Sequence, residues 1–386
     1  MIKFIQGNCL DKLQELEDNS IDCVVSSPPY YGLRDYGVNG QFGLEKTYQE
    51  YLANTVKVFE TFKPKLKDTA TIWWNVGDSY NTKPAGNKDL KKSSGLPNKK
   101  ENLHKRKDNI SKVLLKSLKE KDLLMIPNRV AIALQDAGWY IRSEIIWHKP
   151  NPMPESIKDR PTSCHEKIWL ITKNKKYYYD ADAIREPLAS SSLTRLNQDI
   201  KNQKGSARGN GGRKTNGNMK AVGNLEKRNK RNVWTITTKP FKEAHFATFP
   251  PDLIEPCIKA GCPEKVCVEC GFPYISNYKR TDNNKNFIQT KGKDTPNIKK
   301  GGVRLNENGT TPHFNPPTIE FLNLKKNCNC KTDKFKSGVV LDPFAGAGTT
   351  GIVARSLNRT AILIELNPEY IEISKNRIDK EFGMFK

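Results

Sequence analysis

One stretch near the C-terminus constrains the fold more than any other: Gly338-Val-Val-Leu-Asp-Pro-Phe-Ala-Gly-Ala-Gly-Thr-Thr350. Its aliphatic start predicts a strand that ends at Asp342, and Gly346 and Gly348 allow a tight turn before a helix that begins near Thr349. A helix N-terminus behind a glycine turn accepts a nucleotide-type cofactor at the carboxyl end of the strand. The stretch therefore predicts a doubly wound α/β fold with a cofactor site in this turn.

The residues that follow extend this prediction. A second strand is expected over residues 360–366, and it ends in Glu365, where a carboxylate suits ribose hydroxyls. A doubly wound sheet needs a third strand beside the second, and the strand Lys3–Gln6 is the candidate. Asn8, or Cys9 after it, would then lie near an adenine ring. At this point a generic doubly wound protein, whose glycines serve only the turn, stays an open alternative.

A second stretch, Ser26-Ser27-Pro28-Pro29-Tyr30, follows a predicted buried strand over residues 21–26. The two prolines fix two φ angles and cannot continue a strand ladder, so the loop is rigid and its carbonyls point in set directions. The exocyclic amine of cytosine or adenine is a poor nucleophile, and acceptors for both of its hydrogens favour the pyramidal nitrogen that attacks a methyl group. Ser27 Oγ and the Pro28 carbonyl are the candidate acceptors, and Tyr30 is the candidate stacking face for the base. A plain proline turn is the alternative.

Read together, the two stretches resemble the amino-methylating DNA methyltransferases, and in particular the subgroup whose catalytic tetrapeptide precedes the cofactor loop. The resemblance implies S-adenosylmethionine as cofactor, a circularly permuted Rossmann-like methyltransferase fold, and catalysis by Ser27, Pro28, Pro29 and Tyr30. It also implies the following cofactor-binding residues: Asn8, Phe249, Pro250, Asp342, Pro343, Phe344, Gly346, Gly348, Thr349, Glu365 and Asn367.

Charge favours a nucleic-acid partner. The formal net charge is +23, and residues 81–121 and 190–232 together contribute +18 of it. Both segments are low in apolar residues, which is typical of a surface loop that folds only on binding, and phosphate contact is the functional interpretation. We therefore expect double-stranded DNA as partner. The N-terminus lacks a signal-peptide pattern and no apolar run has membrane-spanning length, so we expect a cytoplasmic, DNA-associated protein from a bacterial or phage genome, without a membrane partner.

The segment from 125 to 189 is expected to form core strands and the walls of a base pocket. A helix is predicted over 127–137, a strand over 139–147, and an aromatic-rich sheet edge from residues 165–171 and 177–180. The resemblance makes four residues of this segment pocket or DNA-contact candidates: Lys149, Asn151, Arg160 and His165. For His165, a structural hydrogen bond beside the strand is the preferred interpretation.

Two neighbouring tryptophans have a structural interpretation. Trp73 and Trp74, in a strand predicted over residues 70–76, are expected in the core or a groove wall.

The pair Pro256-Cys257 is similar to the nucleophile loop of carbon-5 cytosine methyltransferases. Cys257 lies in a helical apolar pattern over residues 252–260, whereas covalent catalysis needs an exposed thiolate of low pKa. We therefore reject the covalent mechanism.

An insertion over residues 264–337 separates this helix from the cofactor strand. It opens with Cys267-Val-Glu-Cys270-Gly and closes with Cys328-Asn-Cys330. Two close thiol pairs have the spacing of a four-thiolate zinc site, and such a zinc would be structural, closing a small zinc-ribbon-like insertion. Four reduced cysteines without metal are the alternative, which we disfavour because clustered free thiols are reactive.

The expected organisation follows the chain. It comprises the catalytic half of the core (1–78), a basic loop (79–124), core continuation with base-pocket walls (125–189), a basic Gly/Asn-rich segment for target recognition and DNA contact (190–232), a core helix on the cofactor side (233–263), the zinc-binding insertion (264–337) and the cofactor-binding half of the core (338–386).

The leading functional hypothesis is a site-specific DNA methyltransferase that flips a base and methylates its exocyclic amine, in a restriction-modification system or in phage or host DNA protection. Ser27, in place of the acid typical of adenine enzymes, favours the N4 amine of cytosine. Adenine N6 is the second candidate and RNA methylation a third. A zinc-finger DNA-binding protein with an inactive cofactor fold is the alternative from another class. A cognate restriction endonuclease is a possible partner.

Overall fold

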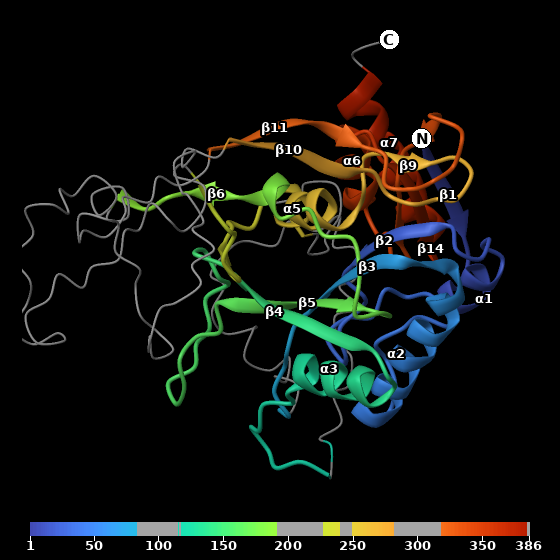
Figure 1. Ribbon diagram of the computed structural model, residues 1–386. Helices are drawn as coiled ribbons and strands as arrows, with labels where there is room; N and C mark the ends of the chain where they lie inside the picture. Colours follow the sequence, from blue (N-terminus) through green and yellow to red (C-terminus); the bar gives the residue numbers. More distant parts are fainter. Residues whose placement is uncertain (83–114, 116, 191–226, 240–248, 282–317, 384–386) are drawn as a thin grey trace, which may run out of the picture. The chain divides into compact units, whose positions relative to one another are not determined.

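The computed structural model (Figure 1) describes residues 1–82, 115, 117–190, 227–239, 249–281 and 318–383. They divide into two compact units. The first comprises residues 1–184, 231–274 and 326–386, and the second residues 185–230 and 275–325. Most of the two predicted basic segments, at 83–114 and 191–226, lies outside the described residues.

The first unit contains an eight-stranded sheet. Its order is β1 (Ile2–Gln6), β14 (Thr360–Glu365), β13 (Val339–Asp342), β2 (Ile21–Ser26), β3 (Leu66–Val76), β5 (His165–Thr172), β4 (Tyr140–His148) and β8 (Val233–Thr235). The five strands from β1 to β3 are parallel, and β5 is antiparallel to both of its neighbours. The prediction that the first strand lies beside residues 360–366 is confirmed.

One prediction about the sheet was wrong. Strand β5 was expected at a sheet edge, but it lies between β3 and β4. Residues 177–180 form no strand; instead, Tyr178 and Asp180 donate backbone hydrogen bonds to Thr69 and Ala260. Pattern alone could not separate an edge strand from an interior one, because aromatic residues suit both positions.

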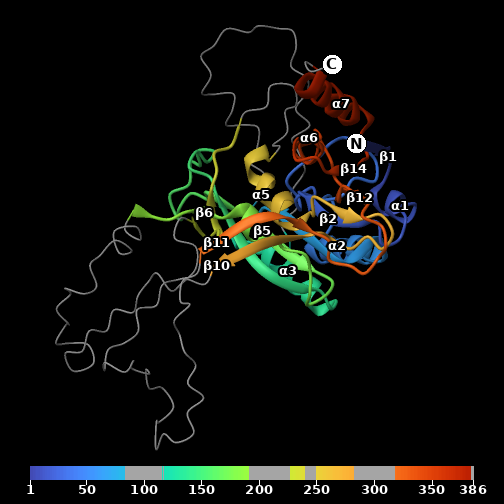
Figure 2. The same cartoon turned by 45° about the horizontal axis from the view of Figure 1, so that its top comes forward.

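Helices cover both faces of the sheet (Figures 1 and 2). Helices α1 (Cys9–Gln14), α2 (Tyr48–Phe62) and α3 (Ile126–Asp136) pack on one face, and α5 (Pro251–Gly261) and α6 (Thr349–Ser356) pack on the other. Helix α7 (Pro368–Phe382) contacts α6, β1 and β14. Trp74 faces the α2 side and Trp73 the α5 side, and both are buried, so their assignment to the core is confirmed.

Helix α2 is shorter than predicted. Thr47 caps its start by accepting a hydrogen bond from the Glu50 N–H at 3.2 Å. The apolar periodicity of the sequence predicts a helix from about Thr47 to Leu66. In the structure α2 ends at Phe62, and a 3-10 turn, η1 (Lys63–Lys65), leads directly into β3. Pro64 has no N–H for the helical ladder, which explains the early end.

A 3-10 turn and three antiparallel strand pairs complete the described elements. In the first unit, a 3-10 turn, η2 (Asp182–Ile184), precedes the pair β9 (Val266–Cys267) and β12 (Phe335–Lys336). The second unit contains two antiparallel pairs: β6 (Glu186–Pro187) with β7 (Lys227–Arg228), and β10 (Ile275–Thr281) with β11 (Thr318–Lys325). Among the described helices, none has both the length and the apolar character that crossing a bilayer requires.

We predict that Phe59→Ala lowers the free energy of unfolding by about 3–5 kcal/mol, because it removes a fully buried ring and leaves a cavity. The Phe59 ring centroid lies 4.9 Å from that of Trp74 and 5.2 Å from that of Trp139. Urea unfolding measures the change. Ile132→Ala, at a position of α3 that is 57% exposed, is the control and should shift stability by no more than about 0.5 kcal/mol.

Candidate active site

The glycine turn after β13 and the tetrapeptide after β2 lie together at the carboxyl ends of the parallel strands. Strands β13 and β2 are neighbours and run parallel, so the loops at their carboxyl ends emerge side by side. Ser26 Oγ, at the end of β2, donates a hydrogen bond of 2.6 Å to Asp342 Oδ1, at the end of β13. Thr350 Oγ1, in the first turn of α6, donates one of 2.6 Å to Asp342 Oδ2. A single carboxylate therefore joins both loops and the helix.

The environment of Asp342 is apolar apart from these donors. The residue is 1% exposed, and burial raises the pKa of its carboxyl to about 6, while hydrogen bonds from Ser26, Thr350 and the Phe344 N–H oppose that rise. Three donors from the chain itself occupy its two oxygens. The structure thus gives Asp342 a role in positioning the loops, and a direct cofactor contact stays a prediction.

The glycine turn is braced from the following strand and helix. Gly346 N–H donates to Glu365 Oε2 at 2.7 Å, and Ser374 Oγ on α7 donates to the Gly346 carbonyl at 2.8 Å. Gly348 has a φ of +74°, and a Cβ there would lie 2.8 Å from Ser374 Cβ, so only glycine fits. A Cβ on Gly346 would meet nothing within 4 Å. Open space over a turn beside a carboxylate fits an S-adenosylmethionine cradle.

The remaining predicted cofactor residues lie around this turn. Glu365, whose carboxyl pKa burial raises, also accepts from the Asn367 N–H at 2.9 Å. Asn367 caps α7 by accepting from Glu369 N–H, and Arg377 donates to Thr349 Oγ1 at 3.2 Å. The Phe344 ring packs against Phe42 and Trp74, next to Pro343.

Asn8 has a local role that the sequence did not reveal. Its Oδ1, proposed to accept from an adenine amine, accepts from the Leu10 N–H at 2.9 Å and so caps α1. Its Nδ2 donates to the Gly40 carbonyl at 3.4 Å. The residue does follow β1 at the carboxyl edge of the sheet, beside β14. The cofactor contact of Asn8 stays a prediction.

The tetrapeptide is held from several sides. Tyr51 on α2 donates to the Pro29 carbonyl at 3.2 Å. Ser27 Oγ donates to the Tyr30 hydroxyl at 3.1 Å, and that hydroxyl donates to Glu166 Oε2 at 2.6 Å. A Cβ on Gly77 would lie 2.5 Å from Tyr30 Cε2, so the ring packs directly on the Gly77 backbone. The two prolines fix two φ angles of the loop, and these tertiary contacts hold it from α2, β5 and Gly77.

Two residues of this site were missed in the sequence. Asn75 on β3 donates from Nδ2 to the Tyr30 hydroxyl at 2.7 Å and to Glu166 Oε2 at 3.0 Å. Glu166 is the neighbour of the proposed His165, whose own side chain is exposed and whose backbone pairs with His148. The sequence did contain a signal for both residues. Asn75 is a polar side chain in an otherwise apolar predicted strand, and Glu166 is an acid at the start of another predicted strand.

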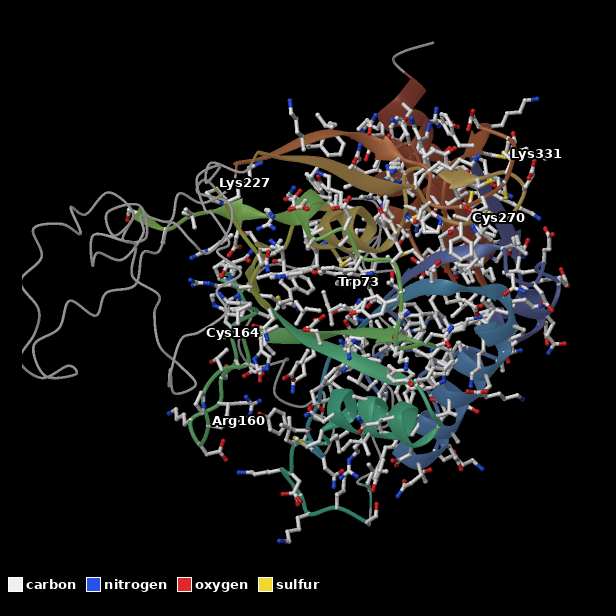
Figure 3. The ribbon with its side chains drawn as sticks, in the orientation of Figure 1. Trp73, Arg160, Cys164, Lys227, Cys270 and Lys331 are labelled. Carbon is white, nitrogen blue, oxygen red and sulfur yellow. The ribbon has the colours of Figure 1, made fainter. Side chains whose placement is uncertain are left out.

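The other predicted pocket residues divide into two groups. Lys149 Nζ contacts Glu166 Oε1 and lies 4.3 Å from the centroid of the Trp147 ring, so it joins the site. Asn151 donates to Thr238 Oγ1 at 2.9 Å, and Arg160 pairs with Glu155 at 2.8 Å. Figure 3 shows Arg160 at the periphery of the first unit, away from Trp73 in the interior. The structure thus gives Asn151 and Arg160 loop-holding contacts.

The helix on the cofactor side is placed as expected. Pro250 precedes α5 at its N-cap, and Phe249 packs against the core cluster on the α5 side of the sheet. Cys257 is 1% exposed within α5 and its Sγ lies 3.5 Å from the Leu253 carbonyl oxygen. A buried helical thiol agrees with the rejection of covalent catalysis.

The four cysteines of the insertion come together in the first unit. All four sulfur atoms of Cys267, Cys270, Cys328 and Cys330 lie within 4.8 Å of one another. A tetrahedral zinc with Zn–S bonds of about 2.3 Å holds its sulfurs about 3.8 Å apart, so the cluster suits that metal. Figure 3 labels Cys270 from one end of the insertion and Lys331, next to Cys330, from the other.

The backbone favours the thiolate form of one cysteine of the cluster, Cys267. The backbone N–H groups of Cys270 and, more weakly, Glu269 lower the pKa of the Cys267 thiol to about 7. Metal binding needs the thiolate form. Strands β9 and β12 pair directly beside the cluster, so the backbone brings the two ends of the insertion together.

Comparison with known proteins places this geometry in a family. A DNA methylase family model matches residues 21–268 and 325–376. The chain is 35% identical over 376 residues to Type II methyltransferase M.Cfr9I of Citrobacter freundii, covering 97% of this chain and 87% of that protein. It is 32% identical over 383 residues to Type II methyltransferase M.SmaI of Serratia marcescens, covering 97% and 90%.

The fold has a counterpart among solved structures. PvuII DNA methyltransferase (cytosine-N4-specific) superposes with a TM-score of 0.51 at 16% identity, covering 99% of this chain and 91% of that chain. At this identity the likeness concerns the fold alone, and it agrees with the expected α/β methyltransferase architecture. The family match leaves out residues 269–324, which lie within the predicted insertion.

We predict that Asp342→Asn makes stability less dependent on pH. The pKa of Asp342 is about 6 in the folded protein against an ordinary 3.8, so the folded state binds this proton more tightly than the unfolded chain. Its contribution favours folding below the ordinary pKa and is lost as the pH rises through the folded pKa, a change of about 3 kcal/mol. Urea unfolding across this range measures the slope. Asp18→Asn, at an exposed carboxyl, is the control; an unchanged slope in Asp342→Asn would contradict the assignment.

Proposed function

We propose that this chain, which belongs to the N6/N4 family of DNA methylases, transfers a methyl group from S-adenosylmethionine to the exocyclic N4 amine of a cytosine flipped out of duplex DNA. One observation carries the proposal. The glycine turn after β13 and the tetrapeptide after β2 share one edge of the sheet and are joined through Asp342. A methyl donor in the turn and a base at the tetrapeptide are therefore neighbours.

The residues of the chain divide the work. The cofactor, when bound, supplies an electrophilic methyl group on a positively charged sulfur. Gly346 lets it approach the backbone, Gly348 allows the turn to pack against Ser374, and Glu365 accepts from its ribose hydroxyls. Phe249 and Pro250 line its methionine end. Ser27 Oγ and the Pro28 carbonyl accept the two amino hydrogens, so that the nitrogen lone pair is directed at the methyl carbon.

Ser27 supports cytosine as the target base. Adenine enzymes of this family typically carry an acid at the first position of the tetrapeptide, and this chain has serine there. Both amines have similar geometry, so adenine N6 is the second candidate. A role in restriction-modification, with a cognate endonuclease as partner, is supported by the relatives named type II methyltransferases.

The chain order also belongs to this proposal. The catalytic strand β2 precedes the cofactor strand β13 in sequence, and β1 completes the sheet beside β14. We interpret this order as a circular permutation of the doubly wound methyltransferase sheet. The basic segments 79–124 and 190–232 would contact the DNA, mostly at phosphates.

Zinc is proposed at the cysteine cluster as a structural ion. Cys267 and Cys270 are separated from Cys328 by a long stretch of chain that a small insertion cannot stabilise with a core of its own. Four thiolates on one ion would close that stretch at its base and contribute to folding. The site lies apart from the tetrapeptide in function, since it offers no open ligand position for catalysis.

Product analysis tests the reaction. Purified protein, incubated with labelled S-adenosylmethionine and genomic DNA, should yield N4-methylcytosine on nucleoside analysis. Ser27→Ala should form no product and still bind the cofactor in calorimetry, because the proposed ligand of the serine is the base and not the cofactor. Recovery of 6-methyladenine would replace cytosine by adenine as the target. Label in RNA alone, or DNA binding without any methylation, would refute the proposed function.

Metal analysis tests the cluster. The wild-type chain should contain about one zinc ion, and Cys328→Ser should lose most of it and unfold at lower urea concentration. Cys164→Ser is the matched control, because Cys164 is an unbridged cysteine in the loop before β5 and outside the cluster. Well-folded, reduced wild-type protein without zinc would exclude the site.

A further inference from the structure

A line of hydrogen bonds leads from the proposed amine acceptor to an acid that no established role explains. Ser27 Oγ donates to the Tyr30 hydroxyl at 3.1 Å, and the Tyr30 hydroxyl donates to Glu166 Oε2 at 2.6 Å. Both hydrogens point the same way, from the base site toward the carboxylate. Glu166 comes from β5, whereas the tetrapeptide follows β2, so only the folded sheet assembles this line.

Asn75 and Lys149 hold the residues of this line in position. Asn75 Nδ2 donates to both the Tyr30 hydroxyl and Glu166 Oε2, so it fixes their relative positions. Lys149 Nζ contacts the other carboxylate oxygen, Oε1, so both oxygens of Glu166 have a partner and the carboxylate is held in place. Burial and the nearby Glu166 charge raise the pKa of Tyr30 far above its ordinary value, so the phenol stays neutral and can both accept and donate a proton.

We propose that Ser27, Tyr30 and Glu166 form a proton relay that removes the proton released by the target amine. This inference rests on the proposed function. As the bond between the amine nitrogen and the methyl carbon forms and the sulfur–methyl bond breaks, the nitrogen becomes positively charged and must lose one proton. That proton passes to Ser27 Oγ, the serine proton passes to the Tyr30 oxygen, and the Tyr30 proton passes to Glu166, which becomes a neutral carboxylic acid.

The relay can reset because its end is open to water. The Glu166 side chain is 17% exposed and that of Lys149 is 19% exposed, so the carboxyl can return its proton to solvent after the reaction. The interior end has no such outlet, since the Tyr30 ring packs on Gly77 and its hydroxyl is surrounded by Ser27, Asn75 and Glu166. Tyr30 thus has a chemical task for its hydroxyl in addition to a ring for stacking.

A double-mutant cycle tests the relay. Single-turnover rate constants are measured for Tyr30→Phe, Glu166→Gln and the double variant, on DNA that the wild-type protein methylates. Each single variant should be about 10²-fold slower, and the double variant should be as slow as either one, because both changes interrupt the same proton path. Calorimetric cofactor affinity should be unchanged in all three variants, which a merely structural defect would not allow.

The pH profile gives a second readout. The wild-type rate should fall on acidification, and this fall should be absent in Glu166→Gln, which has no carboxyl at the end of the relay. Among the described residues, the ionisable groups in contact with Glu166 are Tyr30 and Lys149. Asp342, whose pKa is about 6, is retained in this variant. A fall that persists in Glu166→Gln would therefore be assigned to Asp342 and would count against the relay.

Glu144→Gln is the matched control. Glu144 on β4 pairs with Lys167 on β5 at 2.6 Å, in the same two strands as the relay acid and its lysine neighbour, and it has no contact with the tetrapeptide among the described residues. It should methylate at the wild-type rate. Wild-type activity of Tyr30→Phe, or losses that multiply in the double variant, would overturn the relay. Neither result changes the product identity, so failure of the relay is distinct from failure of the proposed function.

Discussion

The active site depends on one buried carboxylate. Asp342 ends the cofactor strand, yet its shortest hydrogen bonds go to Ser26, which ends the catalytic strand, and to Thr350, in the helix behind the glycine turn. Its position in an apolar interior makes those bonds strong and makes their loss expensive, because unpaired polar groups there find no water. The two halves of the site lie more than three hundred residues apart in sequence, and this acid fixes their distance.

Other side chains also tie the loops of the site to neighbouring strands and helices by hydrogen bonds. Glu365 holds the Gly346 amide from the next strand, Tyr51 holds the Pro29 carbonyl from α2, and Asn75 holds the Tyr30 hydroxyl from β3. Each contact joins a loop to a regular element, so the loops inherit the rigidity of the sheet and its helices. Preorganised acceptors of this kind need little reorganisation when charge develops on the amine. Rigidity of the tetrapeptide therefore comes from its neighbours as much as from its two prolines.

These contacts also separate what the sequence could predict from what it could not. Periodicity and glycine spacing predicted the strands β13 and β14 and the helix after Gly348, because such signals are local. The place of β1 followed from the third strand that a doubly wound sheet needs beside the second. The zinc-type cluster was predictable too, since its spacing is specific. Glu166 and Asn75 were missed, and β5 was misplaced, because strand order decides which side chains meet, and order is a property of the whole sheet. His165 was predicted as a site residue because of its residue type, but its neighbour Glu166 is the residue that contacts Tyr30.

The two acids of the candidate site have different surroundings, and these surroundings suit different roles. Asp342 is buried and accepts hydrogen bonds from two hydroxyl groups, which suits a residue that holds the two loops in place. Glu166 is partly exposed and lies beside the Lys149 ammonium, so solvent can reach it, as the proposed relay requires. Exchanging the two environments would exchange the two tasks. Ser27 connects the two acids. It follows Ser26, which is hydrogen-bonded to Asp342, and it donates to the Tyr30 hydroxyl, which in turn donates to Glu166.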